Sequence, residues 1–322
     1  MHTYLRNRPP WIQLIIFGGL TGGIFVASIY IGTGIVAQAN HMNFSQIASM
    51  TITDYARPEL AGVIKGLLIV QFFGLFFLPS LVFAYLTDPK PLAYAGLKPP
   101  ERISFLFIGL LTMAAAYFMV EWMVTLNEEL VLRTFSKSAQ DWIQKGEEAA
   151  DNTLKNILTM KGPADLLFSI FLVGILPAIG EELFFRGILQ KIFIQIFKKA
   201  WPGIIFTAAL FSAFHGQFMG FIPRMAMGIV LGALYWFSGS IFVSMIGHFI
   251  FNTINVLLIY FKIAEMDSKT SSGWVISLTG LASMVIVILL IKYLRNHSST
   301  SFEKEFLPEG DIKLFDESDG SV

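Results

Sequence analysis

The chain contains no cysteine, few charged residues and no net charge. The absence of cysteine excludes disulfide bonds, thiol nucleophiles and thiolate metal ligands. Charged residues make up only 14% of the 322 residues, whereas soluble domains carry about 25%. A net charge of zero argues against nucleic acid as a partner, because phosphate binding needs an excess of basic side chains. Hydrophobic residues make up 54% of the chain, so we expect a protein solvated by the lipid bilayer.

Long apolar runs dominate the chain, and none alternates between apolar and polar residues as the strands of a membrane barrel do. Each is close to the length that crosses about 30 Å of hydrocarbon as a helix. The sequence therefore predicts an all-α fold, a polytopic transmembrane helix bundle of about eight membrane spans. Pro223 and Arg224 make the sixth of these runs the weakest. The predicted spans are 11–37, 60–87, 104–124, 165–187, 201–217, 221–237, 241–261 and 274–293.

The distribution of lysine and arginine predicts how the chain crosses the membrane. The first apolar run is much longer than the 7–15 residues or so of a signal peptide, which favours an uncleaved anchor. The basic residues gather in alternate loops, which predicts a multi-pass protein of the cell membrane with cytoplasmic N- and C-termini. Short loops with this plain bias favour a bacterial plasma membrane.

The same pattern predicts five parts. They are N-terminal membrane helices (1–124), an extramembrane helical insertion (125–162), a core that carries polar groups inside the membrane (163–261), a final membrane helix (262–297) and an acidic, disordered tail (298–322).

Two adjacent glutamates in the fourth predicted span are the most informative polar residues, because ionisable groups inside a membrane are costly and usually functional. Adjacent helical residues differ by about 100° in direction, so Glu181 and Glu182 cannot face the same cavity. Arg186 follows Glu182 by four residues and suits an ion pair with it. We therefore interpret Glu182 and Arg186 as a structural brace and Glu181 as the free carboxylate. The alternative is that both glutamates are interfacial charges.

A histidine in the fifth predicted span is expected at the depth of Glu181. Glu181 lies 18 residues before Lys199, near the turn between the two spans, and His215 lies 16 residues after it. At about 1.5 Å per residue the two reach similar depth. A carboxylate that faces a histidine in a partly dry cavity is a workable general base. The alternative is a histidine that only makes a hydrogen bond between packed helices.

The seventh predicted span carries a polar stripe at helical spacing: Ser244, His248, Asn252 and Asn255. Such a stripe can hold helices together through hydrogen bonds. It can also supply donors to an oxyanion that forms when a carbonyl is attacked. His248 and Asn252 are one turn apart, a suitable spacing for two donors to one oxygen.

Three short motifs on separate spans resemble those of a known family: Glu181-Glu182 to Arg186, Phe211 to His215, and His248 to Asn252. They match the Glu-Glu-x-x-x-Arg, Phe-x-x-x-His and His-x-x-x-Asn motifs of the CPBP family of intramembrane proteases, in the same order. This family comprises the CAAX prenyl protease type II and bacteriocin-processing (Abi) proteins. The stretch GIVLGALYWFSGSIFVSMIGHFIFN also resembles the family, and the resemblance covers about residues 165–260.

The resemblance implies a role for each matched residue. Glu181 and His215 are expected to activate a water, His248 and Asn252 to stabilise the oxyanion, and Glu182 with Arg186 to brace the site. The implied substrate is a membrane-associated or lipidated peptide or protein, reached from the cytoplasmic side or from the bilayer.

No cofactor is expected. A set of one glutamate and two histidines could bind zinc, but the His-Glu-x-x-His pattern of zinc proteases is absent, which favours a reaction without a metal. Two other functions stay open: a non-catalytic scaffold or bacteriocin self-immunity protein on the same fold, and a transporter that relays protons through Glu181 and the histidines. A transporter would favour inverted repeats, and the sequence contains no clear repeat.

Overall fold

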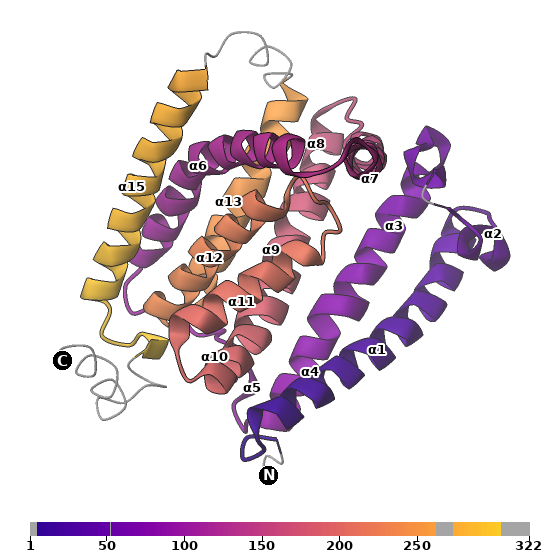
Figure 1. Ribbon diagram of the computed structural model, residues 1–322. Helices are drawn as coiled ribbons and strands as arrows, with labels where there is room; N and C mark the ends of the chain where they lie inside the picture. The colour runs from indigo at the N-terminus through magenta and orange to yellow at the C-terminus, as the bar shows by residue number, and fades with distance from the viewer. Residues whose placement is uncertain (1–4, 52, 262–272, 304–322) are drawn as a thin grey trace.

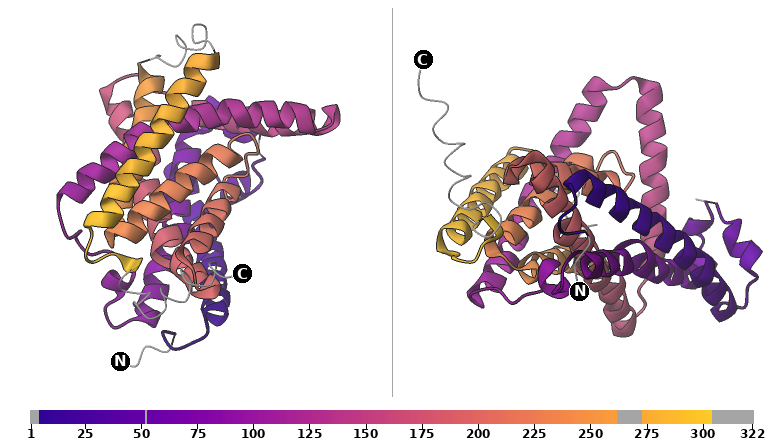
Figure 2. Two further views of the ribbon diagram at one scale, coloured as in Figure 1. Left: turned by 60° about the vertical axis from the view of Figure 1, so that its left-hand side comes forward. Right: turned by 90° about the horizontal axis from the view of Figure 1, so that it is seen from below.

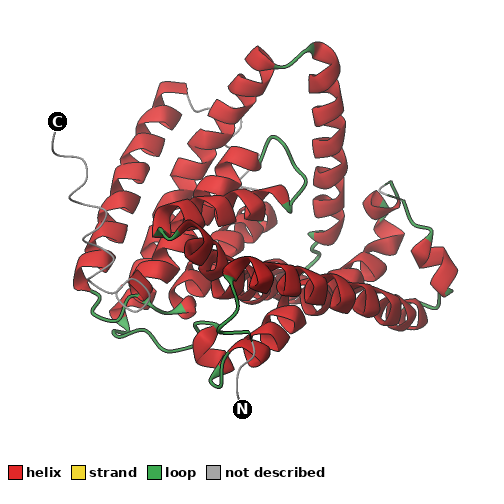
Figure 3. Ribbon diagram, turned by 60° about the horizontal axis from the view of Figure 1, so that its bottom comes forward, coloured by secondary structure: helices red, strands yellow, loops and turns green. Residues whose placement is uncertain are grey.

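The computed structural model describes residues 5–51, 53–261 and 273–303, and every element in this part of the chain is a helix (Figure 3). Seven helical segments are long and apolar enough to cross a membrane: Pro10–Ala39, Pro58–Thr87, Ser104–Thr134, Pro163–Phe197, Phe221–Ser238, Ile241–Tyr260 and Gly273–His297. The remaining predicted span forms the shorter apolar helix Ala200–Ala213, whose 14 residues rise only about 21 Å. The all-α membrane bundle is thereby confirmed.

Several of the long segments are composite. Before the insertion the elements are α1 (Pro10–Ala39), α2 (Phe44–Ala48), η1 (Asp54–Ala56), η2 (Pro58–Leu60), α3 (Ala61–Gln71), η3 (Phe72–Phe77), α4 (Leu78–Thr87), α5 (Pro91–Tyr94) and α6 (Ser104–Thr134). After it come α7 (Lys137–Ile157), α8 (Pro163–Ser169), η4 (Ile170–Ile175), α9 (Leu176–Glu181), η5 (Glu182–Gln190), α10 (Lys191–Phe197), α11 (Ala200–Ala213), α12 (Phe221–Ser238), α13 (Ile241–Tyr260) and α15 (Gly273–His297).

The helices pack so that one of them, α12, is almost enclosed. It contacts α6, α11, α13 and α15, while α1 packs against α3 and α4 on the opposite side of the bundle (Figure 1). The two outer helices, α1 and α15, expose large apolar side chains such as Ile31 and Leu289. A surface of this kind is stable in contact with lipid rather than water. The predicted span with the weakest sequence signal thus lies at the centre of the bundle.

The insertion differs from the predicted 125–162 segment in where its helices begin and end. Helix α6 continues to Thr134, ten residues beyond the predicted end of the third span at 124. A new helix, α7, begins after Ser136, whose hydroxyl accepts the backbone N–H of Ala139 at 3.4 Å. Figure 2 shows the end of α6 and α7 projecting from the bundle. This region lies at the end of the molecule opposite the first turn of α1 and the last turn of α15 (Figure 1).

The chain remains ordered after α15, where the sequence predicted a disordered tail from residue 298. Phe302 is 1% exposed, and its ring lies 4.7 Å from that of Tyr235 on α12. The backbone N–H of Ser299 donates to the Glu101 carboxylate at 2.7 Å, and this bond lowers the pKa of Glu101. The prediction is therefore wrong for 298–303, because the apolar Phe302 has a buried site to fill. Residues 262–272 and 304–322 lie outside the described residues.

Replacing Phe302 with alanine should destabilise the bundle. The substitution empties a buried aromatic site, and large-to-small changes of this kind cost about 3–5 kcal/mol in well-packed cores. Thermal unfolding in detergent should show a lower midpoint for Phe302→Ala and no shift for Leu92→Ala, whose side chain is exposed on α5. Equal midpoints for Phe302→Ala and the wild type would show that the chain after α15 contributes nothing to stability.

Candidate active site

A buried ion pair connects the helices that form the candidate site. Arg186 Nη1 lies 2.9 Å from Glu182 Oε1, and the two side chains are 1% and 0% exposed. His248 of α13 brings its Nδ1 atom to 2.9 Å from the same carboxylate oxygen. On its other side, the Arg186 guanidinium lies 4.7 Å from the centre of the Phe211 ring, a favourable cation–π contact. The ion pair that the four-residue spacing predicted is thus present, and it links η5, α11 and α13.

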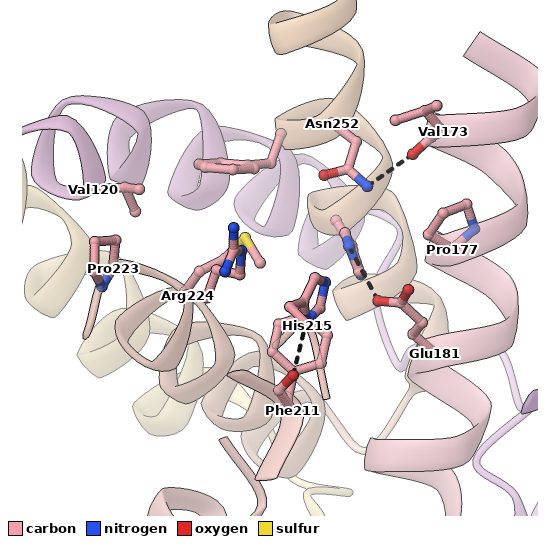
Figure 4. Close-up of a pocket in the computed structure, with 12 residues that line it drawn as sticks. Val120, Val173, Pro177, Glu181, Phe211, His215, Pro223, Arg224 and Asn252 are labelled. Carbon is pink, nitrogen blue, oxygen red and sulfur yellow. Dashed lines mark hydrogen bonds and ion pairs between the residues drawn. The ribbon is translucent and has the colours of Figure 1, made fainter. Parts of the chain in front are cut away.

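Glu181 points away from this pair, into a cavity of about 240 Å³. Its side chain is 14% exposed, so it can meet water where Glu182 cannot. The cavity is far larger than the roughly 10–15 Å³ that a single water needs. Five chemistry-bearing residues line it: Glu181, His215, Arg224, His248 and Asn252 (Figure 4). Seven others complete the wall: Val120, Val173, Pro177, Phe211, Pro223, Met227 and Phe251.

His215 lies just beyond the end of α11 rather than inside a helix. The predicted span 201–217 is therefore too long: α11 ends at Ala213, and the chain turns at Gly216, whose φ of 65° is in the left-handed region that glycine adopts without strain. His215 Nδ1 lies 2.9 Å from the Phe211 carbonyl oxygen. Because a carbonyl can only accept, Nδ1 carries the proton and the Nε2 lone pair is left free. The histidine is exposed at this turn and can take a proton from the cavity.

The side chain of Asn252 is hydrogen-bonded to a backbone carbonyl that has no helical N–H partner because of a proline. Pro177 has no N–H to donate to the carbonyl of Val173, four residues earlier, and the helix widens into the π-helical segment η4 just before it. The side-chain amide of Asn252 donates to that Val173 oxygen at 2.9 Å. One N–H of the amide remains for the cavity. Of the rest of the predicted stripe, Asn255 bonds the carbonyl of Phe251 in its own helix.

The structure brings Glu181, His215, His248 and Asn252 to one cavity, with one change in their expected pairing. His248 has its Nε2 atom 4.0 Å from Glu181 Oε2, so the histidine expected only at the oxyanion also neighbours the free carboxylate. In the sequence, Arg224 served only as an argument against the sixth predicted span. An arginine inside an apolar run is itself a functional signal, and the structure places it in the cavity wall.

The donor set does not suit a chelated metal ion. Within the described ranges, no three carboxylate or imidazole side chains converge as metal ligands. Independence from metals stays a prediction.

Breaking the buried pair should cost much more stability than breaking an exposed pair of the same spacing. Arg186→Met leaves Glu182 buried and uncompensated, for which about 3–5 kcal/mol is typical. Arg133 and Glu129 form the matched control, an i,i+4 pair at 3.3 Å whose side chains are 80% and 57% exposed, and Arg133→Met should cost at most about 1 kcal/mol. Thermal unfolding of both variants tests this, and a similar loss in each would contradict the brace.

Comparison with known proteins points to the same part of the chain. Residues 163–254 match the family described as type II CAAX prenyl endopeptidase Rce1-like. The uncharacterized protein YpbD of Bacillus subtilis (strain 168) is 31% identical over 98 residues, which are 30% of this chain and 49% of YpbD. The chain thus spans about half the length of that curated relative, and no solved structure matches. The family resemblance predicted from the three motifs is confirmed: the segment that carries all three motifs matches the model of the Rce1-like family.

Proposed function

We propose that this protein is an intramembrane endopeptidase that cuts membrane-associated or lipidated peptides with a water activated by glutamate and histidine. The observation that carries the proposal is the single cavity that collects one free carboxylate, two imidazoles and one amide from three separate helical regions. These groups come from the three motifs that the family match covers. A carboxylate or histidine next to a carbonyl-binding donor is the minimum equipment for hydrolysing an amide.

Glu181 is the proposed general base. It is the carboxylate with access to water, since Glu182 is fully buried and paired with Arg186. Glu181 takes a proton from water as the oxygen attacks the carbonyl carbon, and it later returns that proton to the departing amine. His215 assists with the free Nε2 lone pair that its bond to Phe211 leaves. No other group needs to change its number of protons over the cycle.

His248 and Asn252 are the proposed oxyanion donors. The Glu182 carboxylate accepts the Nδ1 proton of His248 and orients the ring, so Nε2 donates into the cavity beside Glu181 when the ring carries a proton on both nitrogens. Asn252 is fixed through its bond to Val173, and its second N–H is the other donor. Donors held in place before the reaction stabilise developing charge without having to reorganise. The buried ion pair thus takes no direct part in the proposed reaction and acts by fixing the ring of His248.

The position of the exposed His215 turn supports a proposal for the direction of access. The carbonyls of Phe218 and Met219 in this turn accept the Asn127 amide of α6 at 3.3 and 2.6 Å, next to α7 and away from the first turn of α1 and the last turn of α15 (Figure 1). If the termini are cytoplasmic, as the charge distribution predicts, this turn lies toward the opposite side of the membrane. Access from the bilayer or from that side then replaces the cytoplasmic route expected from the sequence.

Loss of the base should abolish cleavage, whereas loss of one oxyanion donor should reduce it. Removing a single donor typically costs about 10²–10³ in rate. Glu181→Ala is expected at background and Asn252→Ala at a measurable residual rate. The assay is cleavage of a fluorogenic peptide library, lipidated and unlipidated, by the protein purified in detergent. Equal residual activity in the two variants would contradict these roles.

The matched control for Glu181→Ala is Glu148→Ala, which removes an exposed carboxylate on α7. It should cut like the wild type. Loss of activity in His215→Ala would support the shared role of the pair. If the wild type cuts no peptide and Glu181→Ala keeps the cellular phenotype, the non-catalytic scaffold becomes the better account.

Cleavage should also survive a chelator. The proposed mechanism uses only side chains and water, so incubation with EDTA before the assay is expected to leave the rate unchanged. Loss of activity on chelation, with recovery on adding back zinc, would show that a metal takes part.

A further inference from the structure

Arg224 is a cation in the cavity wall that the proposed reaction does not use. It lies in the first turn of α12 and faces the same space as Glu181 and His215 (Figure 4). Its Nη1 atom is buried and makes no hydrogen bond. Among the described residues, no carboxylate lies within ion-pair distance of Arg224, in contrast to Arg186. Arg224 thus lines the cavity, and one guanidinium nitrogen, buried beside Gly220, has no hydrogen-bond partner.

The insertion holds this guanidinium in place. Arg224 Nη2 donates to the Gln217 side-chain oxygen, and Gln217 Nε2 donates to Glu147 of α7 at 3.2 Å. The other oxygen of Glu147 accepts the backbone N–H of Met219 at 2.9 Å. Gly220 leaves room for the guanidinium, because a Cβ atom there would collide with Nη1. Glu147, Gln217 and Arg224 therefore form a relay from α7 to the cavity.

An arginine presented in this way is suited to a carboxylate. Its planar donors match the two oxygens of a carboxylate, and hydrogen bonds between charged groups are about twice as strong as neutral ones. Because the Nη1 atom is buried, leaving its N–H groups unpaired is costly until a partner arrives. The carboxylate Glu181 in the same cavity is occupied as the proposed base. The missing partner is therefore expected on the substrate.

We propose that Arg224 is the substrate-binding residue for a carboxylate close to the bond that is cut, and that Glu147 is its positioning residue. This inference rests on the proposed function only in taking the cavity as the substrate site. The carboxylate has two sources, an acidic side chain or the free C-terminus of the peptide. The relay also assigns a task to the insertion: α7 holds the turn that carries His215 and orients the guanidinium beside it.

The test is the affinity of the purified protein for three fluorescent peptides of one sequence. The first has a free C-terminal carboxylate, the second a C-terminal amide, and the third a C-terminal amide with one aspartate. Binding is measured by anisotropy in the Glu181→Ala background, so that no peptide is cut. At least one carboxylate peptide should bind better than the neutral amide by about tenfold to hundredfold, the worth of a hydrogen bond to a charged group. The carboxylate peptide that binds better shows whether the recognised carboxylate is the C-terminus or an acidic side chain.

Arg224→Gln in the same background should remove this preference and leave the affinity for the neutral amide within about twofold, and Arg224→Lys should restore part of the preference. Arg133→Gln, an exposed arginine on α6, is the matched control and should change nothing. Equal affinity for all three peptides in the Arg224-containing protein, including no binding of any, would overturn the proposal. A preference that survives Arg224→Gln would overturn it as well.

The relay has its own test. Glu147→Ala should reduce the ratio of carboxylate to amide affinity several-fold at an unchanged unfolding midpoint, whereas Glu148→Ala, its exposed neighbour, should keep the ratio. An unchanged ratio in Glu147→Ala would remove Glu147 from the proposal. If the wild type cuts no peptide, the proposed protease activity fails, but the anisotropy experiment still decides on Arg224.

Discussion

The site depends on one buried charge pair. Glu182 and Arg186 are almost completely removed from solvent, and two charges in that position are stable only together. The pair does more than neutralise itself, because the same carboxylate oxygen takes His248 and the guanidinium packs on Phe211. η5, α11 and α13 are therefore locked around one point. The position of His248 follows from this lock, and so does the separation of Glu182 from the free Glu181.

Irregular backbone geometry positions two further side chains of the site. In a membrane a free backbone carbonyl is costly, since neither water nor lipid can satisfy it. Pro177 frees the Val173 carbonyl, and the amide of Asn252 satisfies it. One local defect thus fixes the rotamer of a proposed oxyanion donor. The turn at Gly216 acts similarly at the other wall, because it ends α11 and leaves His215 exposed beside the cavity rather than within a helix.

The insertion, which has no counterpart in the three motifs, contacts the site through the turn that follows His215. Asn127 and Glu147 hold this turn by its backbone, and Gln217 passes the contact on to Arg224. The segment predicted to lie outside the membrane is in this way connected to the wall of the cavity. The hydrogen bonds from Glu147 through Gln217 also explain why Arg224, a costly residue in an apolar helix, is tolerated in the same cavity as Glu181.

The sequence by itself determined what each residue could do. Apolar runs without alternation were enough to predict the helical membrane bundle. Fixed helical spacing was enough to predict that Glu182 pairs with Arg186 and that Glu181 points elsewhere. These inferences succeed because they depend on neighbours within one helix. Where helices end and which of them meet was decided by the tertiary structure: the end of α11 before His215, the docking of Phe302, the 4.0 Å approach of His248 to Glu181 and the path from Glu147 to Arg224. Such contacts join residues far apart in the chain, and packing alone selects among the many that spacing allows.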